Sequence, residues 1–139
     1  MNDKLLVMKK LILILCVFGS IGVFGQTTTN KDLIKEVNRE LGVDNWSIRG
    51  DNVYIENETG GMGNGYWGIS KVKYSLKYQY WNVGGGVGQN IYVLYVECKE
   101  EEDCIGDLED SYFIKVMNLG LSDDEKRANR VLELLNKLQ

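Results

Sequence analysis

Two cysteines are the first residues in this chain whose type and spacing suggest chemistry. Cys98 and Cys104 are separated by one lysine and four acidic residues. Redox pairs of the thioredoxin type have two intervening residues at the start of a helix, and neighbouring carboxylates disfavour the reactive thiolate. In an exported chain, an even pair of cysteines is most simply a disulfide. We therefore predict a structural Cys98–Cys104 disulfide, with a catalytic thiol pair as the alternative.

The acidic residues around these cysteines suggest a second kind of site. The run Glu100–Asp103 is followed by Asp107, Glu109 and Asp110, and carboxylate oxygens are the usual ligands of calcium. The segment lacks the alternate acidic ligands, central glycine and terminal glutamate of an EF-hand loop. We predict a solvated acidic loop. Whether residues 99–110 bind calcium stays open.

Aromatic residues beside glycine-rich stretches are candidates for ligand binding. Tyr66 and Trp67 follow the glycine-rich residues 57–65, and Trp81 precedes the glycine-rich link at residues 82–89. Exposed tyrosine or tryptophan in such positions can stack on a sugar ring or anchor a protein partner. The alternative is that these rings lie in the core, and for the two tryptophans we keep both interpretations.

The composition excludes many classes of enzyme. The chain has no histidine, which excludes Ser-His-Asp and Cys-His catalysis and histidine-ligated zinc. Residues 63–68 match the letters of a dinucleotide fingerprint, but a strand pattern follows where that motif needs a helix. We predict no cofactor. A hydrolase that uses two carboxylates stays open, because the sequence does not single out a pair.

The amino terminus predicts export. Lys4, Lys9 and Lys10 precede an apolar stretch from Leu11 to Phe24, and this arrangement is typical of a cleaved signal peptide. The apolar stretch is shorter than the roughly 20 residues of a membrane-spanning helix. We predict a signal peptide at residues 1–25 and one secreted or periplasmic domain at residues 26–139, with no membrane insertion after cleavage.

The charge of the chain bears on its partners. The formal net charge is −4, and cleavage after residue 25 would remove three lysines and one aspartate. An acidic surface disfavours nucleic acid and anionic lipid, which need clustered basic residues. The sequence therefore predicts no nucleic-acid partner.

The elements that must position these residues are two helices and a set of strands. Capping and periodicity predict a helix from Thr29 to Gly42, and a second from Ser122 to Leu138 with Ser122 as its cap. Between them we predict an antiparallel sheet, because no strand alternates with a helix. The predicted strands are 46–49, 52–56, 71–81, 91–96 and 112–117, and Leu119–Leu121 is predicted to be a turn.

The long strand at residues 71–81 alternates strictly in polarity. From residue 71 to residue 80, its lysines and polar residues point one way and its apolar and aromatic residues the other, as in a strand with one wet face. We predict that Tyr74, Tyr78 and Tyr80 are core residues. The following strand is apolar on both faces, which predicts a central position in the sheet. The fold class is thus α+β: a bent antiparallel sheet of five or six strands, or a partly open barrel, with an amino-terminal helix and a packed carboxy-terminal helix.

The last third of the chain resembles small secreted bacterial proteins of unknown function. The shared arrangement is a strand ending in Cys98, a short polar loop to Cys104, the strand around Tyr112–Ile114, and a closing helix. It is also similar to the pleckstrin-homology-like fold, in which a carboxy-terminal helix closes a bent antiparallel barrel. The chain differs from that fold in its helix before the strands and in having no basic phosphoinositide-binding loop. Lipid head-group binding is therefore not implied.

Three functional hypotheses follow. The first is an exported, non-enzymatic domain that binds a protein partner, as an inhibitor for example, through a glycine-rich loop or a sheet edge. The second is glycan or cell-wall binding through Trp67, Trp81 and Tyr66. The third is a carboxylate-based hydrolase.

Overall fold

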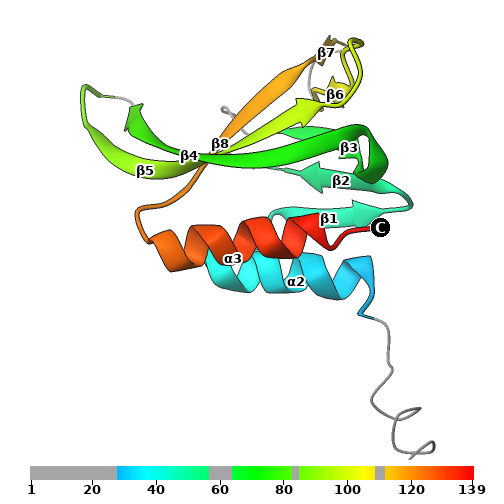
Figure 1. Ribbon diagram of the computed structural model, residues 1–139, viewed down its shortest axis with the longest axis horizontal. Coiled ribbons are helices and arrows are strands. Elements are labelled where there is room, and N and C mark those ends of the chain that lie inside the picture. The colour runs from blue at the N-terminus through cyan, green and yellow to red at the C-terminus, as the bar shows by residue number, and fades with distance from the viewer. Residues whose placement is uncertain (1–27, 57–63, 83–84, 109–111) are drawn as a thin grey trace, which may run out of the picture.

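The computed structural model describes residues 28–56, 64–82, 85–108 and 112–139. These residues form an α+β domain with a helix at each end of the described part, as predicted (Figure 1). The strands form two antiparallel sheets, of five and three strands, in place of the predicted single sheet of five or six strands or partly open barrel. The predicted signal peptide lies outside the described residues, as do Glu109 and Asp110. Within the described ranges, no helix is both long enough and apolar enough to cross a membrane.

Helix α2 (Asn30–Leu41) forms where the capping residues predict it. The Thr29 hydroxyl accepts a hydrogen bond from the Asp32 N–H, and the Asp32 carboxylate accepts one from the Thr29 N–H. Gly42 ends the helix with a φ of 66°, a conformation that favours glycine. The buried side of the helix consists of Leu33, Ile34 and Val37.

The first sheet, sheet A, has five strands in the order β1-β2-β3-β6-β7. Its strands are β1 (Trp46–Arg49), β2 (Asn52–Ile55), β3 (Gly65–Gly68), β6 (Ile105–Gly106) and β7 (Phe113–Ile114). The β1–β2 hairpin turns at Gly50, where φ is 60°. A short 3₁₀ turn, η1 (Ile69–Lys71), then leads from sheet A to the second sheet.

The second sheet, sheet B, has three strands in the order β4-β5-β8. They are β4 (Val72–Asn82), β5 (Gly88–Cys98) and β8 (Val116–Ser122). β5 is central, as predicted from its two apolar faces. A single residue, Lys115, separates β7 in sheet A from β8 in sheet B, so the two sheets share a corner without closing into a barrel.

The carboxy-terminal part corrects three predictions. The predicted strand at residues 112–117 is divided at Lys115 between β7 and β8. Residues 119–121 belong to β8 and are not a turn, because Leu119 and Gly120 pair with β5. The register between the two strands shifts between Tyr92 and Val93. Helix α3 spans Glu125–Asn136, and its cap is Asp124, whose carboxylate accepts from the Arg127 N–H. Ser122 cannot be the cap because it still pairs with Tyr92 in the sheet.

The core lies between the helices and the sheets. α2 and α3 lie side by side, and they pack on β1 and β4 respectively (Figure 1). The side chains that meet there include Trp46, Trp67, Val72, Leu94, Val96, Ile105, Val131 and Leu135. Tyr74 packs against this cluster. The prediction that Tyr78 and Tyr80 are core residues is wrong, since they are 59% and 61% exposed.

Candidate functional site

The two cysteines form the predicted disulfide. Cys98 at the end of β5 is bonded to Cys104 just before β6, and the Cys104 N–H also donates to the Cys98 sulfur at 3.0 Å. Cys98 is buried. The bond thus joins the end of sheet B to the start of a strand in sheet A, and this pair acts as a structural link.

Trp67 is a core residue. Its side chain is 0% exposed, and the Trp46 ring meets it nearly at right angles with centroids 6.0 Å apart. Its indole N–H donates a hydrogen bond of 2.8 Å to the Tyr74 hydroxyl, and burial raises the pKa of Tyr74 to about 12. Of the two interpretations kept for Trp67, the structure agrees with the core position, where its ring is not open to a ligand.

Tyr66 belongs to a row of aromatic rings on the other face of β3. Register pairs it with Tyr54 on β2 and Gly106 on β6. The Tyr54 ring stacks on it at 5.3 Å, and a Cβ on Gly106 would lie 2.4 Å from its ring. Phe113 meets it edge-on at 6.2 Å. Tyr66 therefore packs on neighbouring rings and on the backbone of sheet A.

Trp81 lies on the outer face of sheet B. A Cβ on Gly120 would approach the Trp81 ring nitrogen at 3.1 Å and the Ile91 side chain at 2.9 Å. Ile91 and Val93 are buried on this same face. Trp81 is partly buried, so its ring covers a small apolar area and keeps some surface open to solvent.

The most exposed aromatic group lies at the far end of the β4–β5 hairpin. This tyrosine patch consists of Tyr78, Tyr80 and Tyr92. Tyr78 and Tyr92 are directly opposite in the register, and their ring centroids are 4.8 Å apart. The Tyr80 ring lies over Gly88, where a Cβ would be 2.2 Å from it. The hairpin extends past the amino end of α3 (Figure 1), which leaves the patch uncovered on the side of the helices.

The tyrosine patch lies beside the acidic start of α3 and on a strand that pairs continuously with its neighbour. Partial burial, Glu125 and Tyr78 all raise the pKa of Tyr92, which puts the acidic start of α3 beside the patch. Register pairs are continuous from Val72–Cys98 to Asn82–Gly88, so the tyrosines stand on a paired strand. Gly85 and Gly86 at the hairpin end have φ values of 66° and 76°. The patch is thus an aromatic surface on a regular element.

The acidic segment after Cys98 forms part of a charged surface hollow of about 420 Å³. Its walls carry both signs of charge, including Lys73, Lys115, Glu97 and Glu100, and Lys73 forms an ion pair of 3.4 Å with Glu97. Across the described residues, no three aspartate, glutamate or cysteine side chains gather as metal ligands.

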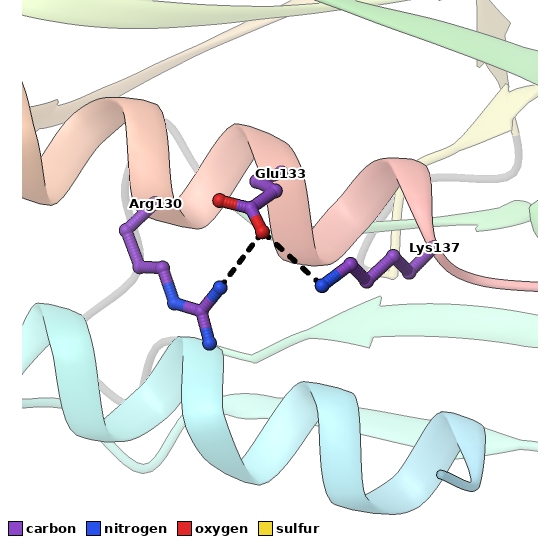
Figure 2. A network of polar contacts seen from close by, with 3 residues as sticks. All are labelled: Arg130, Glu133 and Lys137. Atoms are coloured by element: carbon purple, nitrogen blue, oxygen red, sulfur yellow. Dashed lines mark hydrogen bonds and ion pairs between the residues drawn. The ribbon is translucent and has the colours of Figure 1, made fainter. Parts of the chain in front are cut away.

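A second hollow, of about 480 Å³, lies between α2 and α3. Leu33 and Leu134 contribute apolar surface, and Arg130 and Lys137 contribute positive charge. Figure 2 shows both cations directed at one carboxylate oxygen of Glu133, at 3.0 and 3.1 Å. The hydrogen bond from Lys137 and both positive charges lower the pKa of Glu133. Since Glu133 engages both cations, this hollow is a weaker candidate for an anionic ligand than its lining alone suggests.

Comparisons with known proteins give no relative: no protein-family model, no curated protein and no solved structure matches the chain. The resemblances to small secreted proteins and to the pleckstrin-homology-like fold stay predictions. The tyrosine patch is therefore selected as the candidate site by its geometry alone.

Proposed function

We propose that this protein is an exported, non-enzymatic domain that binds a protein partner through the tyrosine patch. The observation that carries the proposal is the exposure of Tyr78 and Tyr80, 59% and 61%, on a strand whose one side is paired with β5 along its length. Tyrosine is enriched at protein interfaces because its ring buries a large area while few rotatable bonds become fixed. A patch fixed on a strand has little backbone freedom to lose on binding.

Export is supported by two features. Residues 1–25 have the pattern of a signal peptide, and the Cys98–Cys104 disulfide suits an oxidising compartment. We therefore place the binding event in the periplasm or outside the cell. A small domain with a protruding hairpin could act there as an inhibitor or as an adaptor.

Site-specific cross-linking tests the proposal. A photoreactive amino acid would replace Tyr80 in the full chain, expressed in the cells that make the protein, and a matched variant would carry it at Tyr112, which is 52% exposed. We expect one protein to cross-link at position 80 in a stoichiometric yield and not at position 112. The double variant Tyr78→Ala/Tyr80→Ala should lose that partner. Equal labelling at both positions would contradict the proposal.

Glycan binding remains the alternative, and the same variants separate it from the proposal. Since Trp67 is buried, the sugar would have to bind at Trp81 with its partly open ring. Soluble cell-wall oligosaccharides should then change tryptophan fluorescence, and Trp81→Ala should abolish the change. Such a response, unaffected by Tyr78→Ala/Tyr80→Ala, would favour the glycan hypothesis.

A further inference from the structure

β4 is an edge strand with a long unpaired side. It lies at one end of the order β4-β5-β8 and runs for 11 residues. Within the part of the chain that the structure describes, β5 is the only strand that pairs with it. An edge of this length presents backbone donors and acceptors to which another extended chain can bind.

The register identifies the backbone groups that face outward. The Lys99 N–H donates to the Lys71 carbonyl at 2.9 Å, which makes these two residues a hydrogen-bonded pair just before Val72–Cys98. Such pairs alternate along an antiparallel ladder. Lys73, Lys77 and the other odd-numbered residues of β4 therefore bond to β5. The N–H and C=O groups that point away from β5 belong to Val72, Tyr74, Leu76, Tyr78 and Tyr80.

A bond on the other side of β5 agrees with this assignment. Cys98 is opposite Val72, and its N–H donates at 2.9 Å to the carbonyl of Lys115, beside β8. The even-numbered residues of β5 thus bond toward β8, as the alternation requires. The open backbone groups of β4 consequently include those of the two exposed tyrosines.

The two faces of β4 differ in chemistry at this edge. One face presents Tyr78 and Tyr80, and the other presents the exposed lysines Lys73 and Lys77. Lys73 forms an ion pair with Glu97 on the neighbouring strand, so Lys77 is the main positive charge offered to an added strand. The Lys77 ammonium lies 4.3 Å from the centre of the Tyr95 ring. A strand added to this edge would place its side chains on these faces alternately.

We propose that β4 accepts an extended segment of a protein partner as an added strand, with acidic residues on the lysine face alternating with apolar or aromatic residues on the tyrosine face. This inference rests on the proposed function and specifies the chemistry of the partner. Backbone hydrogen bonds supply affinity in this mode of binding, and the side chains supply specificity. A second copy of the chain fits poorly, because antiparallel pairing of two β4 strands puts their lysines on one shared face, where like charges repel.

The test uses a capped eight-residue peptide that alternates glutamate and valine, with a lysine–valine peptide as the charge control. Amide exchange and chemical shifts of the full chain would be followed by NMR up to millimolar peptide. We expect slower exchange at the Tyr78 and Tyr80 N–H groups with the glutamate peptide only. Unchanged exchange at both residues would overturn the proposal, and so would equal binding of the lysine peptide.

Two variants at one position isolate the backbone contribution. Tyr78→Pro removes an outward N–H without removing a bond to β5, whereas Tyr78→Ala keeps that N–H and removes the ring. Proline is tolerated at such positions of edge strands, and circular dichroism would check folding, with Tyr80→Pro as a second variant. We expect proline to weaken peptide binding at least tenfold relative to alanine, and Lys77→Glu to weaken it as well. Equal affinity of the proline and alanine variants would overturn strand addition.

The cross-linked partner distinguishes this inference from the proposed function. If Tyr78→Ala/Tyr80→Ala loses the partner while Tyr78→Pro keeps it, the tyrosine patch binds a protein but β4 does not gain a strand. If neither variant changes capture, both proposals fail. A concentration-dependent dimer that Tyr78→Pro abolishes would show that a second copy takes the edge, and would overturn the acidic segment as its occupant.

Discussion

The Trp67 indole N–H donates a hydrogen bond of 2.8 Å to the hydroxyl of Tyr74 across the boundary between the two sheets. Trp67 lies on β3 in sheet A, and Tyr74 lies on β4 in sheet B. Their rings also meet edge to face, with centroids 6.3 Å apart. This polar contact links the two sheets inside the core.

Removing the acceptor of this bond should destabilise the fold. In Tyr74→Phe, the Trp67 N–H stays buried without its partner, and an unsatisfied buried donor costs about 1 to 3 kcal/mol. We expect a loss of that size in the free energy of unfolding, measured with urea. The control is Tyr78→Phe, which should change stability little because that hydroxyl is exposed. Equal effects of the two variants would contradict the role of the bond.

The same tyrosine predicts a loss of stability in alkali. Burial raises the pKa of Tyr74 from 10.0 to about 12, so between pH 10 and 12 the unfolded chain releases a proton that the folded chain retains. Stability is complete below pH 10 and falls as the pH rises through this window, by up to about 2 to 3 kcal/mol. Urea unfolding at pH 9 and pH 11 would measure the fall. Tyr74→Phe should show a smaller one.

The disulfide should contribute through the unfolded state. Closing the short loop between Cys98 and Cys104 stabilises the fold by about 2 kcal/mol on the chain-entropy estimate. We expect the Cys98→Ser/Cys104→Ser variant to lose that amount of free energy of unfolding, measured with urea. The reduced parent protein should show the same loss. A reduced protein as stable as the oxidised one would show that the link adds nothing.

Helix α3 offers a test of which residue caps it. Asp124→Ala should cost about 1 kcal/mol, because the Arg127 N–H loses its acceptor. Ser122→Ala should cost about 0.5 kcal/mol or less, since its hydroxyl accepts only from the exposed Asp124 N–H. The reverse order in thermal or urea unfolding would restore Ser122 as the cap.

Much of the fold could be predicted from local signals. Thr29 with Asp32, and Gly42, define α2 at both ends, and strict alternation defines β4. The path of β8 could not be predicted this way. Gly120 resembles a turn residue, yet it lies within the strand. A glycine is needed there because the Trp81 and Ile91 side chains occupy the space where a Cβ would be. That contact joins residues far apart in the sequence, and no local pattern reports it.

The sequence wrongly predicts that Tyr78 and Tyr80 are core residues, and the reason is the limited length of the covering helix. Alternation shows which face of β4 is apolar, but it does not show how far the cover reaches. A strand of 11 residues spans about 36 Å, whereas a helix of 12 residues spans about 18 Å. The helix therefore covers only part of β4. The exposed end of β4 is the one that carries Tyr78 and Tyr80, which only the packing of the helix on the sheet reveals.

The contact between α2 and α3 has a consequence for how the protein is made. Leu33, Ile34 and Val37 of α2 belong to the core cluster that α3 completes with Val131, Leu134 and Leu135. While the chain is still being synthesised, α3 is not yet there to cover that stripe. We therefore expect the unfinished polypeptide to remain open until α3 is complete, and such an open chain is a state that chaperones bind.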